Sequence, residues 1–203
     1  ERVALLKKAE GSTAKTAKIL GLGAKEKLLV KDVIKNNDGT THTRYERTYD
    51  GLPVLGGDFV VKAEDVAKAE GIARPFITHL GTPKTTPAIA ASRAQEQALS
   101  AAKTLGAEKA TTDRAPRKVI WAANGTPKLA YETVVGGLQE DGTPNELHVI
   151  TDAATGKQLY KYQAVKNGTG NTMYSGTVTL GTSLSGSTYT LNDAARGGHK
   201  TYN

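Results

Sequence analysis

Residues 28–63 alternate between apolar and polar side chains with a period of two, which predicts antiparallel β-strands. The expected strands are 28–35, 40–49, 52–55 and 58–62. In the second strand one face carries Thr43, Tyr45 and Tyr49, and the other carries His42, Arg44, Glu46 and Thr48. Asp38-Gly39 is a strong hairpin signal, because a type I′ turn needs positive φ at both central residues. The pattern therefore predicts a meander.

A helical period follows this meander. The apolar positions that recur on one helical face are Ala94, Ala98, Ala101 and Leu105. Ser92 and Gln95 match a capping box, and Gly106 suits the C′ position at the helix end. We therefore expect one helix of about three turns over Ser92–Leu105. The segment Gly81–Pro87 contains two prolines and is the expected linker before it.

Strands return after the helix, at 118–122, 129–135, 147–151 and 158–162. Asn124-Gly125 separates the first two, and the last two flank the hairpin Asp152–Gly156. Strands followed by a helix and then more strands predict an α+β fold. We expect two small antiparallel-sheet modules, the second with a packed helix.

The last 40 residues differ in composition. Ala164–Asn203 contains seven Gly, eight Thr and four Ser, and only four charged side chains. Strands are expected at 175–180 and 187–191, but too few large apolar residues accompany them to close a core. We therefore expect a truncated β segment. The chain begins at Glu1 and its single Met is Met173, so we also expect an incomplete translation product.

Composition narrows the classes of partner. The net charge of +7 is spread along the chain with acidic residues interspersed, and 11 aromatic residues offer few stacking surfaces, which disfavours nucleic-acid binding. No run approaches the roughly 18 apolar residues of a membrane-spanning helix. Without cysteine there is neither a disulfide nor a thiolate metal site. We expect no nucleic-acid or membrane partner.

No catalytic or metal-binding residue is assigned within residues 1–203. The four histidines are His42, His79, His148 and His199, and no pair has the i, i+4 spacing of a zinc helix. We expect His148 to be a solvated strand residue. Ser183 and Ser185 lack the Gly-x-Ser-x-Gly spacing of a nucleophile elbow. The acidic residues in expected loops or strand ends are Glu64, Asp65, Asp113, Glu140 and Asp141, and turn capping explains them.

Three segments resemble the precursors of thermolysin-like metalloproteases. The run His42–Asp58, with its Arg-Tyr, Gly-x-Pro-Val and Gly-Gly-Asp pattern, resembles the fungalysin/thermolysin propeptide domain. Lys128–Tyr162 resembles a PepSY domain. The pieces of the tail that resemble the first strands of a mature thermolysin-like zinc endopeptidase are Gly168–Gly170, Tyr174–Gly176, Tyr189–Asp193, Arg196–Gly198 and Thr201–Asn203. The resemblance implies domains at 1–80 and 88–163, a linker at 81–87, and the start of a catalytic domain at 164–203.

The resemblance also implies a function. Residues 1–163 would be the pro-region of a secreted zinc metalloendopeptidase, assisting the folding of its catalytic domain and inhibiting it until the junction is cut. The partner would be that catalytic domain. Its zinc helix, zinc and calcium sites and general acid/base would lie beyond Asn203, so no catalytic residue carries over and residues 1–203 hold no cofactor.

The processing site is expected within Gln163–Asn167, between the last PepSY-like strand and the mature-like pattern. Thermolysin-like enzymes as a family favour an apolar residue after the scissile bond, and Val165 is the only large aliphatic side chain in this window. We therefore expect cleavage between Ala164 and Val165, in extended and isolated backbone, whereas Leu159 should be hydrogen-bonded in a strand. The alternative is that these residues only form an exposed linker between two domains, which any protease can cut.

Two other functions remain open at this point. A freestanding secreted binding module for anionic polymers or the cell wall would use the positive charge, and its binding would weaken strongly with salt. A hydrolase complete within 203 residues would show activity in an assay with a chelator control.

Overall fold

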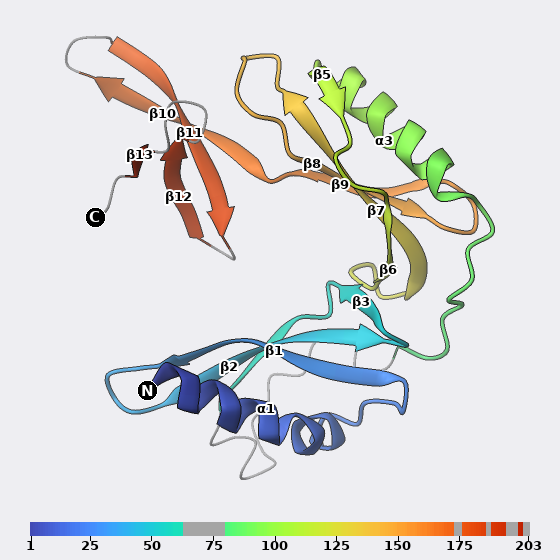
Figure 1. The fold of residues 1–203 in the computed structure, drawn as a ribbon, viewed down its shortest axis with the longest axis vertical. Coiled ribbons are helices and arrows are strands. Elements are labelled where there is room, and N and C mark those ends of the chain that lie inside the picture. Colours follow the sequence, from blue (N-terminus) through green and yellow to red (C-terminus); the bar gives the residue numbers. More distant parts are fainter. Residues whose placement is uncertain (63–79, 173–175, 186–187, 194–198, 201–203) are drawn as a thin grey trace. The chain divides into compact units, whose positions relative to one another are not determined.

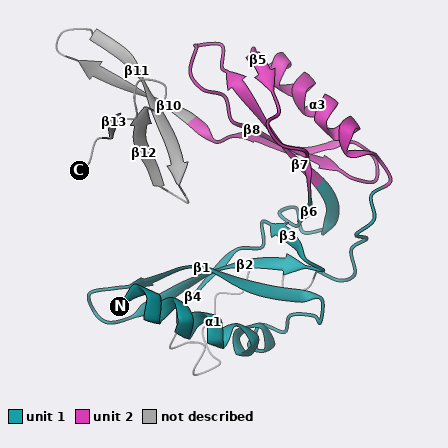
Figure 2. Cartoon of the chain, in the orientation of Figure 1, with its two compact units in different colours: residues 1–87, 118–130 teal, residues 88–117, 131–203 magenta. Residues whose placement is uncertain are grey.

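The computed structural model describes residues 1–62, 80–172, 176–185, 188–193 and 199–200, with side chains described up to Val165 (Figure 1). The chain has an α+β fold and divides into two units (Figure 2). Unit 1 is Glu1–Pro87 with Lys118–Ala130, and unit 2 is Ala88–Arg117 with Tyr131–Asn203. None of the helices in the described part of the chain is long and apolar enough to cross a membrane.

Unit 1 begins with a helix and continues as a meander. Its elements are α1 (Arg2–Ile19), β1 (Glu26–Lys35), β2 (Thr41–Tyr49), β3 (Leu52–Leu55) and β4 (Phe59–Lys62). Strand β2 pairs antiparallel with β1, with β3 near Tyr49 and with β4 near Tyr45. Strand β6 (Arg117–Trp121) returns to run parallel to β3, with Val54 opposite Ile120. The four strands predicted for this segment are confirmed.

The core of unit 1 follows from the alternation in its strands. One cluster buries Leu20, Leu28, Tyr45, Phe59 and Val61. The inward face of β2 also includes Arg47, which the sequence pattern did not assign to it. The Arg47 guanidinium forms an ion pair with Glu26, and both side chains are buried. The core can contain the charged Arg47 guanidinium because the Glu26 carboxylate that neutralises it is buried beside it.

Unit 2 packs one helix on an antiparallel sheet. Its elements are α3 (Ala91–Thr104), β5 (Glu108–Thr111), most of β7 (Lys128–Leu138), β8 (Leu147–Asp152) and β9 (Gln158–Gln163). Strand β8 lies between β7 and β9, and β5 pairs with β7 (Figure 1). Helix α3 buries Ala98 and Ala102 against Val135, Leu147 and Val149.

The predicted helix is present, but two of its details were wrong. It begins at Ala91 after Ala90, with no side-chain cap, and Gln95 donates to Thr112 Oγ1 instead of completing a capping box with Ser92. The buried stripe is Ala94, Ala98 and Ala102, whereas Ala101 is only half-buried and Leu105 is 52% exposed. Gly106 ends the helix with φ of 77°, as predicted.

The tail forms its own antiparallel sheet, in the order β10 (Val165–Thr172), β11 (Gly176–Ser185), β12 (Thr188–Asp193) and β13 (His199–Lys200). The two strands predicted here fall on β11 and β12, except for Ser175 and Ser187, which lie outside the described residues. Most of the tail motifs at 174–176, 196–198 and 201–203 also lie outside them. Strand β9 ends at Gln163 and β10 starts at Val165, so only Ala164 lies between them. The extended linker expected at Gln163–Asn167 is therefore reduced to one residue.

Candidate functional site

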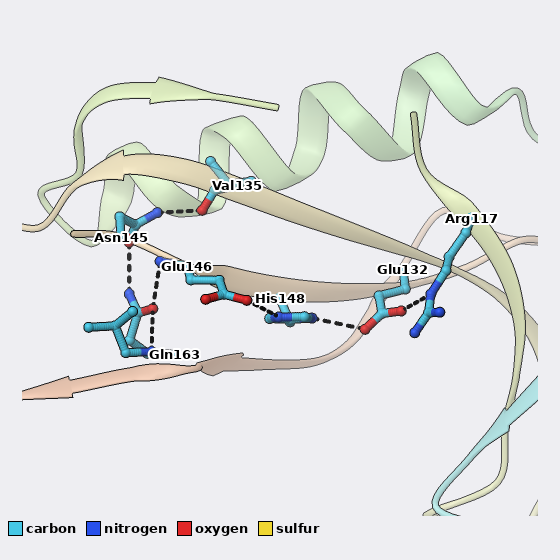
Figure 3. A network of polar contacts seen from close by, with 8 residues as sticks. Arg117, Glu132, Val135, Asn145, Glu146, His148 and Gln163 are labelled. Atoms are coloured by element: carbon cyan, nitrogen blue, oxygen red, sulfur yellow. Dashed lines mark hydrogen bonds and ion pairs between the residues drawn. The ribbon is translucent and has the colours of Figure 1, made fainter. Parts of the chain in front are cut away.

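The candidate site is a polar network on the face of the unit 2 sheet that α3 does not cover (Figure 3). Along β7 and β8, residues alternate between the two faces. Val135, Leu147 and Val149 pack toward the helix, so Glu132 and His148 lie on the opposite face. Here a cleft of about 580 Å³ opens. Its charged and imidazole side chains are Asp113, Arg114, Arg117, Glu132, Glu146 and His148.

A buried carboxylate is the centre of this network. Glu132 is only 2% exposed, and its two oxygens have different partners. Arg117 Nε donates to Oε2, while His148 Nδ1 lies 2.9 Å from Oε1. Burial by itself raises the pKa of Glu132, but the hydrogen bonds of His148 and Arg117 outweigh it and the pKa is lowered. Glu132 is therefore a charged acceptor that its two cationic partners stabilise.

His148 is enclosed on three sides. Its second nitrogen, Nε2, lies 3.4 Å from Glu146 Oε1, and its ring stacks on Tyr162 at 4.6 Å between centroids. The side chain is 15% exposed, so the expectation of a solvated strand histidine was wrong. Burial lowers the pKa of His148, but the hydrogen bonds and charges of Glu132 and Glu146 more than offset this and leave the pKa raised. The arrangement favours an imidazolium between two carboxylates.

A second set of contacts joins the end of β9 to β7. Asn145 is 8% exposed, and its Nδ2 donates to the Val135 carbonyl at 2.7 Å. Its Oδ1 accepts from Gln163 Nε2 at 2.7 Å (Figure 3). Gln163 Oε1 in turn accepts from the Glu146 backbone N–H at 2.8 Å. Two neutral amide side chains thus connect β9 to β7 through the residues that precede β8.

The expected processing residues lie at the edge of this network. Ala164 is the single residue between β9 and β10, and its N–H donates to the Glu146 carbonyl at 2.9 Å. Val165 begins β10 and lines the cleft. The bond between them is therefore next to Asn145, Glu146 and Gln163. The structure does not place this bond in an isolated loop.

Other candidate residues have separate roles or lie outside the description. Asp141 caps a turn, as predicted, by accepting from the Thr143 N–H and hydroxyl. Asp113 lines the cleft. Glu64, Asp65 and His79, and the side chains of Ser183, Ser185 and His199, lie outside the described residues. Among the described residues, no cluster of His, Cys, Asp or Glu could hold a metal ion.

Sequence reasoning missed the network residues Arg117, Glu132, Asn145, Glu146 and Gln163. One signal was available, because Glu132 is a lone carboxylate in the otherwise uncharged run Leu129–Val135. A charge within a buried strand needs a partner. The sequence did not indicate which side chains from other segments would supply it.

Comparisons with known proteins show which proteins this chain is similar to. Residues 26–65, which span β1 to β4, match the Fungalysin/Thermolysin Propeptide Motif. The chain is 58% identical over 203 residues to the transglutaminase-activating metalloprotease of Streptomyces mobaraensis, covering 100% of this chain and 27% of that protein. It is 33% identical over 172 residues to the thermolysins of Alicyclobacillus acidocaldarius subsp. acidocaldarius and Bacillus caldolyticus, covering 80% of this chain and 30% of each.

The chain therefore spans less than a third of the length of these relatives. The similarity to the Streptomyces protein runs through both units, because it covers every residue of the chain. The strands of unit 1 carry a fungalysin/thermolysin propeptide motif, and the chain as a whole is similar to a part of known metalloproteases.

Proposed function

We propose that this chain contains the pro-region of a secreted thermolysin-like zinc metalloendopeptidase, which assists the folding of its catalytic domain and inhibits it until the junction is cut. The observation that carries the proposal is the propeptide motif at 26–65 within a chain that is similar over its full length to part of a metalloprotease. The partner is the cognate catalytic domain, which supplies the zinc, the calcium and the catalytic residues.

The proposal assigns a role to each part of the chain. Residues 1–80 are the propeptide-like domain, 81–87 the linker, 88–163 a PepSY-like domain, and 164–203 the beginning of the catalytic domain. The sheet β10–β13 supports the last boundary, because it starts at Val165 and is separate from the sheet that contains β9. Processing is proposed between Ala164 and Val165, where the two sheets are joined.

Tethering explains how a modest interaction can inhibit. A pro-region on a short linker meets its partner at an effective concentration of order millimolar, so an intrinsic dissociation constant of order micromolar gives about thousandfold saturation. Cleavage and dilution remove this advantage. Processing therefore acts as a switch without any change in the contacts themselves.

The test is inhibition in trans. We expect the 203-residue chain to inhibit the mature transglutaminase-activating metalloprotease of Streptomyces mobaraensis at micromolar concentration, measured with a small fluorogenic peptide. A synthetic peptide covering residues 158–170 is the matched control for simple substrate competition, and mass spectrometry follows cleavage of the chain. Absence of inhibition at high micromolar concentration would rule out the inhibitory role. Inhibition by the peptide to the same extent would assign the effect to substrate competition.

A further inference from the structure

The backbone on both sides of the Ala164–Val165 bond is already hydrogen-bonded within unit 2. The Ala164 N–H donates to the Glu146 carbonyl at 2.9 Å, which extends the ladder between β8 and β9 by one residue. The Val165 N–H, which belongs to the bond itself, donates to Gln163 Oε1 at 3.4 Å. Val165 also pairs with Ser183 at the start of β10.

Gln163 connects these contacts to the rest of the sheet. Its Oε1 accepts the Glu146 N–H, and its Nε2 donates to Asn145 Oδ1 (Figure 3). The same Oε1 also accepts the Val165 N–H. Asn145 is anchored in turn, because its Nδ2 bonds the Val135 carbonyl and its own N–H bonds the Gly137 carbonyl. The side chain of Gln163 therefore connects the junction to β7 through Asn145, whose buried amide is hydrogen-bonded at both its nitrogen and its oxygen.

This arrangement opposes cleavage. A protease binds its substrate as an extended strand whose N–H and C=O groups bond to the enzyme. The N–H groups of Ala164 and Val165 are instead bonded within the chain, so they must be released before an enzyme can use them. When opening and closing are fast, the cleavage rate follows the population of the open form. Any contact that lowers this population protects the bond.

We propose that Asn145 and Gln163 form a latch, in which their hydrogen bonds hold residues 163–165 against the sheet. The population of molecules in which these bonds are broken then sets the rate of cleavage at the junction. The proposal rests on the processing site proposed above. Asn145 and Gln163 are positioning residues here, since they hold the backbone and take no part in the chemistry of peptide hydrolysis.

The central variant is Gln163→Ala in the 203-residue chain. It removes the acceptor for two backbone N–H groups and the donor to Asn145. We expect hydrogen exchange at the Ala164 and Val165 amides, and cleavage at 164–165 by added thermolysin, to accelerate about tenfold. Gln163→Glu keeps the acceptor but loses the donor, so we expect an increase of a smaller size. The matched control is Gln158→Ala, at the exposed start of β9, which should behave as the wild type.

The measurements separate the latch from the processing site. Exchange reports the opening without any protease, and mass spectrometry identifies the bond that is cut. If Gln163→Ala exchanges and is cut at the rate of Gln158→Ala, the latch is wrong. If exchange accelerates while cleavage falls at another bond, the latch is supported and the processing site is wrong. Far-UV circular dichroism checks the fold, and Gln163→Glu carries the test if Gln163→Ala fails to fold.

Discussion

Replacing Ala98 by Asp tests how α3 packs on the unit 2 sheet. Ala98 and Ala102 are fully buried in an apolar cluster with Val135, Leu147 and Val149. We expect the substituted aspartate to enter the core protonated. At pH 7, protonating a carboxyl whose unfolded pKa is about 3.9 costs about 4 kcal/mol, since each pH unit is about 1.4 kcal/mol. Burying the neutral acid adds about 1–3 kcal/mol.

The free energy of unfolding should therefore fall by about 5–7 kcal/mol at pH 7, which is comparable to the whole stability of a small domain. At pH 4 the protonation cost nearly vanishes, so the loss relative to wild type should shrink to about 1–3 kcal/mol. Urea denaturation followed by far-UV circular dichroism at both pH values measures this. Ser100→Asp places the same residue at an exposed position of α3, where it can stay ionised, and is the control. If Ala98→Asp unfolds at the same urea concentration as Ser100→Asp at pH 7, the packing described here is refuted.

Two further predictions concern the buried charges. The hydrogen bond and charge of Glu132 leave the pKa of His148 raised although burial lowers it, so the imidazolium stabilises the fold below about pH 6.5, and this contribution is lost as pH rises through the folded pKa. His148→Gln should remove this pH dependence, and a wild-type urea midpoint that rises between pH 6 and 8 would contradict the sign. Glu26→Gln should destabilise unit 1 by about 3 kcal/mol, because it leaves the Arg47 guanidinium buried without its carboxylate. Thermal unfolding measures this, with Glu46→Gln at the half-exposed pair to Lys31 as the control that should change little.

The sequence could not predict the first helix. Only Ala9 and Thr16 are buried along α1, and Gly11, Ser12 and Thr13 interrupt it with poor helix formers. The helix therefore lacks the broad apolar stripe by which amphipathic helices are recognised. Its last turn packs Ala17 and Ile19 against the cluster of Leu20 and Leu28. At the other end Arg2 forms an ion pair with Asp32 of β1. Tertiary contacts therefore stabilise what local propensity leaves undecided.

The strands show what the sequence by itself determined. Alternation in a β-strand is a local property, because successive side chains point to opposite faces whatever the strand pairs with. That is sufficient to predict β1–β4, and it places Tyr45 and Tyr49 on one face, which is the buried one. The type I′ turn expected at Asp38-Gly39 was wrong, because only Gly39 of the two has a positive φ, whereas both residues of Asp50-Gly51 do. The α+β class follows from the order of such local patterns.

Only the tertiary structure decided the network around Glu132. Glu132 is 15 residues from Arg117 and 16 residues from His148 in sequence, and the three meet because neighbouring strands bring them to one face in register. The same holds for Asn145 and Gln163, which are 18 residues apart. Register depends on the free energy of the whole core and on the irregularity between Ile150 and Thr151, and a shift by one residue would turn each side chain to the other face. The sequence specifies which residues are polar, but the partner of each one depends on how the sheet as a whole packs.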